Sequence, residues 1–379
     1  MTEEILQIDD LQLKFYTYEG VVEALDGVKI NLKKGETLGI VGETGCGKSV
    51  TGLSVLSIVL PPGKIEGGQI IFNVKGRAIN LLNLGDSVLR KIRGKYISMI
   101  FQDPRSALNP VYTAGDQIIE ALLKHKIKEL AEKAIEELDK EAKNKKANFL
   151  TRYCRNNLQK IVLNPKASSL KIVSKIPLLN RYKKLLYKQA KKEAIRMLRL
   201  MRIPDPERVV DMYPHELSGG MAQRVVIAMA LACNPEVLIA DEPTTNLDVT
   251  VQLQILNLIK ELKQQFSSAI IYITHDMGVV AELCDRVAVM YAGNVVEIAD
   301  TLEIFKNPLH PYTKGLLESI PRPGCQFKSI EGTVPSLIDP PKGCRFHNRC
   351  QYAMEICTRV KPKMIDVGKN HFIQCFLYQ

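Results

Sequence analysis

The stretch 42–49, Gly-Glu-Thr-Gly-Cys-Gly-Lys-Ser, constrains the fold of this chain more than any other feature. It follows the apolar run 37–41, which is short enough for a buried parallel strand, and it precedes the helix-like residues 50–56. Glycines let successive N–H groups face one anion, and a helix N-terminus adds partial positive charge. The stretch therefore predicts a phosphate-binding loop, in which Lys48 reaches the terminal phosphates and Ser49 ligates magnesium.

The composition favours a soluble globular protein with room for two or three domains, because the chain has 379 residues and 46% of them are hydrophobic. No run of 18 apolar residues occurs, so no segment is expected to span a bilayer. The acidic start at residues 1–4 is unlike a secretory signal, and we expect a cytoplasmic protein. The nine cysteines then indicate reduced thiols or a metal site rather than disulfides.

Three further apolar runs are predicted to be strands, and polar residues follow each of them. These are 95–101 before Gln102, 236–240 before Asp241 and Glu242, and 269–274 before His275. Ligands of open α/β sheets bind at the carboxyl ends of the strands. Asp241 is expected to hold Mg²⁺ through water, and Glu242 to orient and deprotonate the attacking water. A lone histidine is more often structural, but its place at this sheet edge favours a functional role for His275.

Residues 217–224 form a second loop before a predicted helix at 225–231, with Ser218, Gly219 and Gly220 as anion donors. One nucleotide does not need two such sites on one chain.

The N-terminal region is predicted to hold strands at 5–15 and 28–32, with a break at 16–20. An aromatic ring in that break, Tyr16 or Tyr18, can stack on an adenine base, and ordinary loop packing is the alternative.

These motifs, in this order, resemble those of an ATP-binding-cassette (ABC) ATPase over roughly residues 5–325. The set is the loop 42–49, Gln102, the signature 217–220, Asp241–Glu242, Asn246–Asp248 and His275. The resemblance implies an α/β P-loop core with a parallel sheet, an N-terminal antiparallel β subdomain and a helical subdomain at about 105–235. It also implies that two chains pair head to tail, so that the signature of one closes on the ATP held by the other.

The resemblance further implies ATP and Mg²⁺ as ligands and assigns a role to each matching residue. Glu242 is the catalytic base, His275 contacts the γ-phosphate, Ser49 and Gln102 contact Mg²⁺, and Tyr16 is preferred over Tyr18 for adenine. The residues implied to contact ATP are Gly42, Glu43, Thr44, Gly45, Cys46, Gly47, Lys48, Ser49, Val50, Gln102 and Asp241, with Ser218, Gly219 and Gly220 acting from the partner chain.

Four segments resemble the oligopeptide/dipeptide importer branch: 101–104, 107–110, 213–217 and 307–313. Two departures from that branch are Ala222, where a charged or polar residue is more common, and Asn246 in place of alanine. The resemblance implies an energy-coupling ATPase at the cytoplasmic face of the membrane. Its partners would be a second homologous ATPase, two permease subunits and an extracellular solute-binding protein. Oligosaccharide import and a soluble nucleic-acid-associated ATPase are the alternatives.

Residues 326–379 are predicted to form a small C-terminal domain after an ATPase domain of residues 1–325. The segment contains Cys344, Cys350, Cys357 and Cys375 in a polar, loop-rich setting, which fits tetrahedral zinc or an iron–sulfur cluster. It resembles the C-terminal domain of peptide-importer ATPases, some of which carry a [4Fe–4S] cluster, and we therefore favour the cluster. Cys325 is not expected to be a ligand.

The interval between Gln102 and the signature contains a basic insertion at about 126–192. Residues 124–196 hold 21 Lys and Arg against 7 Asp and Glu, although the whole chain is only +11. No acidic residue occurs from 142 to 192, so we expect few internal salt bridges to compete for these charges. The pattern favours contact with anionic lipid, and a nucleic-acid arm and a solvated insertion are the alternatives.

Overall fold

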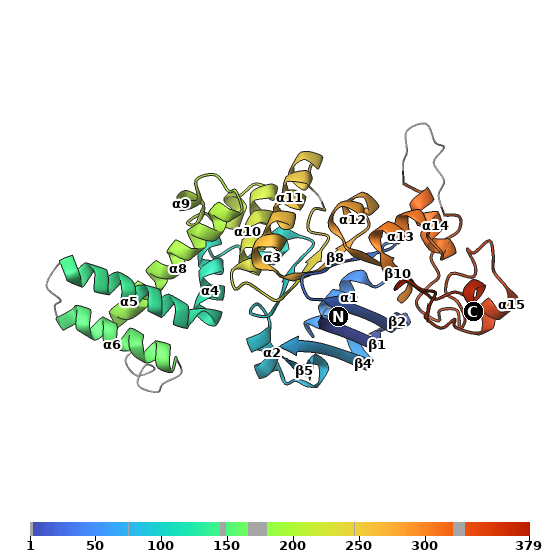
Figure 1. Ribbon diagram of the computed structural model, residues 1–379, viewed down its shortest axis with the longest axis horizontal. Coiled ribbons are helices and arrows are strands. Elements are labelled where there is room, and N and C mark those ends of the chain that lie inside the picture. Colours follow the sequence, from blue (N-terminus) through green and yellow to red (C-terminus); the bar gives the residue numbers. More distant parts are fainter. Residues whose placement is uncertain (1–2, 75, 145–148, 166–179, 246, 321–329) are drawn as a thin grey trace. The chain divides into compact units, whose positions relative to one another are not determined.

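The computed structural model describes residues 3–74, 76–144, 149–165, 180–245, 247–320 and 330–379 (Figure 1). Asn246, Cys325 and the parts 145–148 and 166–179 of the basic insertion lie outside these residues. The chain divides into two compact units. The first unit comprises 1–93, 236–245 and 252–379, and the second comprises 94–235 and 246–251. The division of the chain at residue 325 stays a prediction.

An antiparallel sheet opens the first unit and confirms the predicted N-terminal β subdomain. Its strands are β1 (Glu4–Thr17), β2 (Gly20–Lys33), β4 (Gly63–Val74) and β5 (Arg77–Asn80), in the order β2-β1-β4-β5. The predicted break at 16–20 is confirmed only as a tight turn at Tyr18 and Glu19, because β1 and β2 stay paired up to Thr17 and Gly20. Tyr16 therefore lies in a strand rather than in a loop.

A second sheet forms the core of the first unit. Its strands there are β3 (Thr37–Val41), β7 (Val237–Asp241), β8 (Ala269–Thr274), β9 (Arg286–Tyr291), β10 (Asn294–Asp300), β11 (Ile365–Asp366) and β12 (Phe372–Ile373), in the order β11-β12-β10-β9-β3-β8-β7. Strand β3 pairs in parallel with β8 and β9, and β7 pairs in parallel with β8. Every residue of β3, β7 and β8 is buried, as expected of parallel strands covered on both faces.

The first unit also contains helices, of which α11 begins within the part 246–251 that is assigned to the second unit. They are α1 (Lys48–Val55), α2 (Asp86–Ile92), α11 (Val249–Phe266), α12 (Met277–Leu283), α13 (Thr301–Lys306), α14 (Pro311–Glu318) and α15 (Glu355–Arg359). None of the helices in the described ranges combines the length and the apolar character that a membrane span needs.

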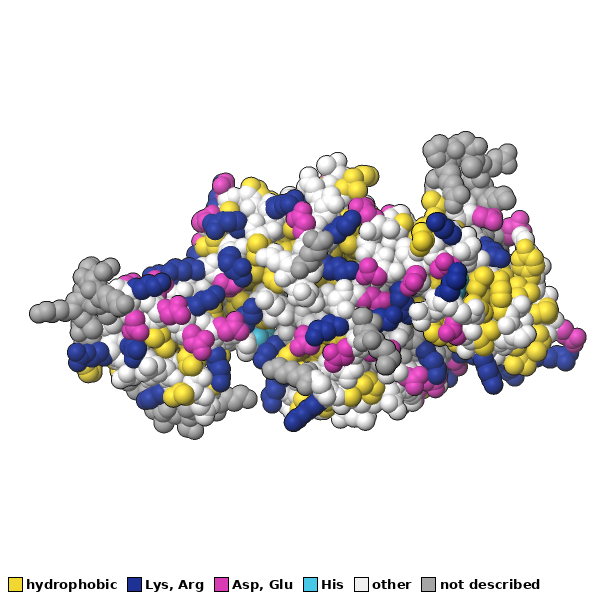
Figure 2. All heavy atoms as spheres, viewed as in Figure 1, with side chains coloured by type: hydrophobic (Ala, Val, Ile, Leu, Met, Phe, Trp, Pro, Cys, Tyr) yellow, Lys and Arg dark blue, Asp and Glu magenta, His cyan; other side chains and the backbone are white. Residues whose placement is uncertain are grey.

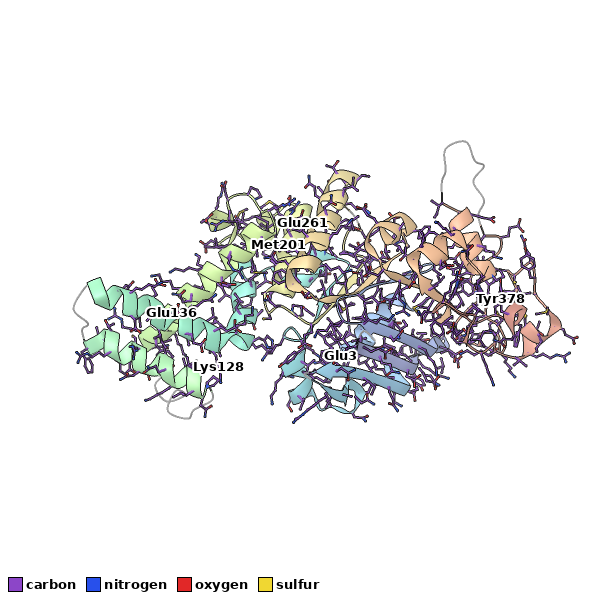
Figure 3. The ribbon with its side chains drawn as sticks, viewed as in Figure 1. Glu3, Lys128, Glu136, Met201, Glu261 and Tyr378 are labelled. Carbon is purple, nitrogen blue, oxygen red and sulfur yellow. The ribbon has the colours of Figure 1, made fainter. Side chains whose placement is uncertain are left out.

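The C-terminal residues 330–379 belong to the first unit, because β12 pairs with β10. Glu297 on β10 is fully buried, and its carboxylate accepts from the backbone of Leu309 and His310 and lies 2.7 Å from Nε2 of His371. The Tyr378 hydroxyl, labelled in Figure 3, donates to the carbonyl of Leu309 at 3.3 Å. Polar contacts thus attach the end of the chain to the sheet.

The second unit is mostly helical. It contains β6 (Ile97–Ile100), α3 (Pro104–Ala107), α4 (Ala114–His125), α5 (Ile127–Asn144), α6 (Phe149–Leu163), α8 (Arg181–Leu200), α9 (Pro206–Val209) and α10 (Gly219–Leu231). The basic insertion forms α5, α6 and part of α8, which bury apolar side chains such as Leu138, Leu158 and Leu186.

The expectation that few salt bridges compete for the basic charges is wrong. Lys188 and Lys192 both pair with Glu137 of α5, and Lys191 pairs with Asp211. Lysine and arginine side chains alternate with acidic ones over this part of the surface (Figure 2). The acid-free run finds its partners elsewhere in the sequence, because the fold brings α8 beside α5 and beside the residues after α9.

Candidate functional site

The glycine-rich loop joins β3 to α1 in a backbone conformation that requires glycine. Gly42 has φ +154°, and a Cβ there would lie 2.1 Å from the Met290 carbonyl oxygen. Gly47 has φ +100° and caps α1, where a Cβ would lie 2.9 Å from the Ala24 carbonyl oxygen. The loop therefore leads directly into the N-terminus of an eight-residue helix, which is a favourable place for an anion.

Lys48 is held inside this loop. Its side chain donates from Nζ to the carbonyl oxygen of Gly42 at 2.7 Å and to that of Glu43 at 3.1 Å. The residue is only 5% exposed. A positive charge thus lies within the curl of the loop, where it attracts phosphate oxygens.

Parallel pairing brings the remaining groups to the same edge of the sheet. Strand β8 lies between β3 and β7, and its end at Thr274 is opposite Val41, while Ile273 is opposite Asp241. The Ser49 hydroxyl donates to Oδ1 of Asp241 at 2.9 Å. Two oxygen ligands of the kind that Mg²⁺ prefers are therefore adjacent. Burial raises the pKa of Asp241, and the hydrogen bond from Ser49 acts against that rise.

Glu242 and His275 follow β7 and β8. The Nδ1 atom of His275 lies 3.2 Å from Oε1 of Glu242, and the Thr245 hydroxyl donates to Oε2 at 3.0 Å. Glu242 has φ +44°, a left-handed conformation that is rare for glutamate and occurs often at functional sites. Its side chain is 13% exposed, whereas that of His275 is 60% exposed. The two side chains can hold a water between a base and a polar ring.

The signature and Gln102 lie in the second unit. The Ser218 hydroxyl caps α10 by accepting from the Met221 backbone at 3.3 Å, and it keeps its own hydrogen to donate. The helix therefore begins at Gly219, earlier than the sequence predicts, because the signature glycines form its first turn. A Cβ on Gly220 would lie 2.9 Å from Cγ1 of Val251. Gln102 is exposed just after β6.

Tyr16 is half exposed, and its hydroxyl donates to Glu66 at 2.8 Å. It lines a pocket of about 630 Å³ together with other residues of β1 and β2 and with residues 338–342. The residues that line this pocket do not include the phosphate loop, and the adenine contact stays a prediction.

The four C-terminal cysteines occupy one segment of the first unit. Burial raises the pKa of the Cys344 thiol to about 11, and the nearby Cys357, Cys375 and Cys350 act in the same direction. The Cys344 backbone N–H donates to the Cys357 carbonyl at 2.8 Å. No three His, Cys, Asp or Glu side chains in the described ranges stand close enough to hold a metal ion together. The thiols are thus neighbours without forming a ligand set as they stand.

Two residues that the sequence did not single out hold the phosphate loop at Glu43. The Tyr312 hydroxyl accepts from the Glu43 backbone N–H at 2.9 Å, and Arg349 donates to the Glu43 carboxylate at 2.7 and 3.1 Å. Tyr312 lies in the 307–313 segment, and Arg349 directly precedes Cys350. The sequence marked Tyr312 only as part of the 307–313 segment, and Arg349 only as the neighbour of a C-terminal cysteine.

Comparison with known families gives two matches. The model described as "ABC transporter" matches residues 25–245, and the model described as "Oligopeptide/dipeptide transporter, C-terminal region" matches residues 296–357.

Individual relatives match almost the whole chain. The dipeptide transport ATP-binding protein DppD of Bacillus subtilis is 44% identical to this chain. The matched region covers 99% of this chain and 95% of the length of DppD. The oligopeptide transport ATP-binding protein OppD of the same organism is 43% identical over 98% of this chain and 88% of its own length. OppD of Salmonella typhimurium is 42% identical over 94% of this chain and 89% of its own length. The dimeric ATP-binding cassette MJ0796 shares the fold, with a TM-score of 0.55 and 23% identity over 78% of this chain and 98% of that one.

Proposed function

The chain belongs to the ABC transporter family and its oligopeptide/dipeptide branch, and we propose that it is the ATP-hydrolysing subunit of an importer for dipeptides or oligopeptides. The observation that carries the enzymatic part is the meeting of Lys48, Ser49, Asp241, Glu242 and His275 at one sheet edge. The peptide substrate follows from relatives named for dipeptide and oligopeptide transport over nearly the full chain. Oligosaccharide import is the lesser alternative, because these relatives are named for peptides.

The phosphate loop binds the triphosphate. Lys48 exchanges its bonds with the Gly42 and Glu43 carbonyls for bonds to phosphate oxygens, and the N–H groups at the start of α1 face the same anion. Ser49 and Asp241 hold magnesium, with Gln102 as a further ligand. Magnesium neutralises the charge that develops on the phosphate oxygens. Tyr16 is the residue proposed to stack on the adenine base.

Hydrolysis uses Glu242 as the general base. Its carboxylate accepts a proton from the attacking water, which becomes bonded to the γ-phosphorus while ADP leaves. His275 lies 3.2 Å from that carboxylate and orients the water and the γ-phosphate. Thr245 fixes the second carboxylate oxygen, so that the base keeps one orientation.

The signature Ser218–Gly220 acts on ATP held by a partner chain. Its hydroxyl and the N-terminus of the thirteen-residue helix α10 form an anion site that the chain's own nucleotide does not need. The partner is a second homologous ATPase, and the pair works at the cytoplasmic face of the membrane. Two permease subunits and an extracellular solute-binding protein complete the importer.

The C-terminal cysteines form the site of a [4Fe–4S] cluster, with zinc as the alternative. The proposal is based on four cysteines in one segment, three of which lie near enough to Cys344 to raise the pKa of its thiol further. Ligation requires the thiols to move closer together than they stand here.

The basic insertion contacts anionic lipid beside the permease. Several of its lysines pair with Glu137 and Asp211. Fewer basic side chains therefore support a contact with lipid than the sequence implied. Arg152, Lys160 and Lys184 are exposed on α6 and α8 and can face headgroups.

The function is tested by assembling the chain with its second ATPase and two permeases in liposomes. We expect ATP hydrolysis that rises when the solute-binding protein is added with a short peptide, and that does not rise with an oligosaccharide. Stimulation by the oligosaccharide alone would exclude the peptide substrate. Assembly without either membrane subunit, together with tight RNA binding, would favour the nucleic-acid alternative.

A further inference from the structure

The phosphate loop carries a carboxylate, Glu43, beside a site that attracts phosphate. A negative charge there opposes ATP binding, because it repels the phosphates and competes for the nearby lysine. The structure pairs this carboxylate with Arg349, which donates from both terminal nitrogens at 2.7 and 3.1 Å. The arginine side chain is 4% exposed and that of Glu43 is 28% exposed, so water screens this pair only weakly.

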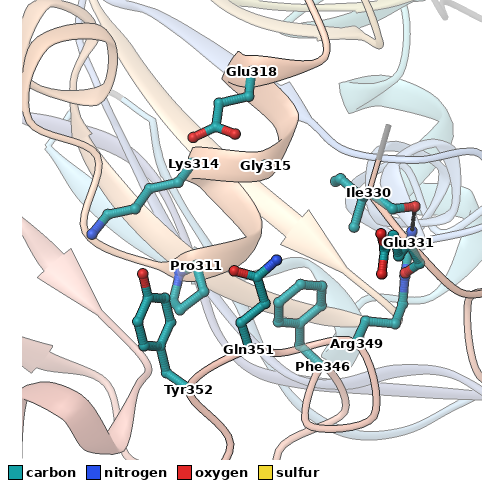
Figure 4. Close-up of a pocket in the computed structure, with 10 residues that line it drawn as sticks. All are labelled: Pro311, Lys314, Gly315, Glu318, Ile330, Glu331, Phe346, Arg349, Gln351 and Tyr352. Atoms are coloured by element: carbon teal, nitrogen blue, oxygen red, sulfur yellow. Dashed lines mark hydrogen bonds between the residues drawn. The ribbon is translucent and has the colours of Figure 1, made fainter. Parts of the chain in front are cut away.

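Arg349 is itself held in place from several sides. Its guanidinium donates to the carbonyls of Glu331 at 3.0 Å and Ile330 at 3.2 Å and to the Tyr291 hydroxyl at 3.2 Å. The ring of Phe346 lies within cation–π distance at 5.9 Å. Figure 4 shows Arg349 beside Ile330 and Glu331 at the wall of a pocket of about 640 Å³. An arginine fixed in this way presents a rigid fork to one carboxylate.

Glu43 links these contacts to Lys48, the lysine of the phosphate loop. Its backbone N–H donates to Tyr312, and its carbonyl accepts from Nζ of Lys48 at 3.1 Å and from the Cys46 backbone at 3.3 Å. One residue therefore joins Arg349, α14 and Lys48. A change in the position of its carboxylate acts directly on the loop that binds phosphate.

We infer that Arg349 is a positioning residue of the ATP site, which neutralises Glu43 and keeps its carboxylate away from Lys48. This inference rests on the proposed function, because it concerns how strongly ATP is bound. Arg349 adjoins Cys350, so the cysteine segment and the phosphate loop share this contact. Loss of the arginine frees the carboxylate to compete with phosphate for the lysine.

The test is an equilibrium titration of the full-length chain with ATP, at constant salt, for Arg349→Met, Glu43→Gln and the double variant. We expect Arg349→Met to bind ATP about tenfold more weakly. Glu43→Gln removes the competing charge and is measured as the reference for the double variant. The double variant should return to the affinity of Glu43→Gln, because there is no carboxylate left to neutralise. Arg349→Lys should lie between wild type and Arg349→Met, since lysine keeps the charge and loses the fork.

Arg90→Met is the matched control, because it breaks an exposed arginine–carboxylate pair with Asp86 on α2 and should leave ATP affinity unchanged. In the assembled importer, Arg349→Met should raise KM for ATP and leave kcat within about twofold. The inference is overturned if Arg349→Met binds ATP like wild type, or if adding Glu43→Gln fails to rescue it. The latter result would show that Arg349 acts through its contacts with residues 330–331, Tyr291 and Phe346 rather than through the Glu43 carboxylate. Wild-type chain that binds no ATP would instead defeat the proposed function.

Discussion

The Nδ1 atom of His275 lies 3.2 Å from Oε1 of Glu242, although 33 residues separate them in the chain. The two strands that precede them, β7 and β8, are parallel neighbours, and their carboxyl ends deliver both side chains to the edge that carries the phosphate loop. Sheet pairing thus brings the carboxylate of Glu242 beside the ring of His275.

Replacing Glu242 by glutamine should leave ATP binding intact and reduce turnover by roughly 10²- to 10⁴-fold, because the amide cannot accept a proton. The assembled importer would be assayed for phosphate release and for nucleotide affinity. Glu282→Gln is the matched control, since that carboxylate is exposed on α12 and pairs with Lys260. Turnover within a few-fold of wild type in Glu242→Gln would show that another group is the base.

Replacing Lys48 by alanine should weaken ATP binding by roughly 10- to 100-fold, because it removes a charge-assisted hydrogen bond to phosphate. An equilibrium titration with ATP would measure the loss. Lys29→Ala removes an exposed lysine that pairs with Asp9 and should have no effect. Unchanged affinity in Lys48→Ala would contradict the phosphate-loop assignment.

Chain purified without oxygen should be brown and contain about four irons and four sulfides. Cys350→Ser should lose the colour and the iron, whereas Cys154→Ser should keep both because Cys154 is buried in α6 of the second unit. Visible absorption and metal analysis distinguish the outcomes. Stoichiometric zinc without iron would replace the cluster by a zinc site.

Vesicles containing anionic lipid should bind the isolated chain in a salt-dependent way. Replacing Arg152, Lys160 and Lys184 by alanine should weaken binding at least tenfold at low salt, because each basic side chain near the surface contributes about 1 kcal/mol. A control triple variant would replace Lys34, Arg77 and Lys91, which are exposed in the first unit. Binding that ignores salt, or tighter binding to RNA than to lipid, would rule out the lipid contact.

The stability of the chain should fall as the pH is lowered from 6.5 towards 4, in part through His310. Burial lowers the pKa of this fully buried histidine from 6.5 to about 4, although Glu297 opposes the shift. The unfolded chain therefore binds a proton in this range that the folded chain does not, and the loss reaches up to about 3 kcal/mol.

Urea unfolding at pH 6.5 and pH 5 would measure this effect. His310→Asn keeps an acceptor at the N-cap of α14 and removes the titration, so its stability should fall less between the two pH values. An equal fall in both proteins would mean that His310 does not cause the dependence.

The sequence by itself determined the charged and polar groups of the candidate site and the strands that precede them. A glycine pattern before a helix, and polar residues after short apolar runs, are local signals, because backbone conformation and strand ends depend on nearby residues. The strands β3, β7 and β8 and the residues Lys48, Asp241 and Glu242 could therefore be predicted. The continuation of β1 through Tyr16 and Thr17 could not be predicted, because pairing between β1 and β2 overrides local composition.

Only the tertiary structure decided which distant groups meet. The sequence gives no sign that Arg349 neutralises Glu43, 306 residues away, or that Glu137 pairs with Lys188 and Lys192. Side-chain ion pairs depend on distances of a few ångströms between elements, and no periodicity along the chain encodes such distances. The charge of a segment can be counted from the sequence, but the neutralisation of that charge is a property of the fold.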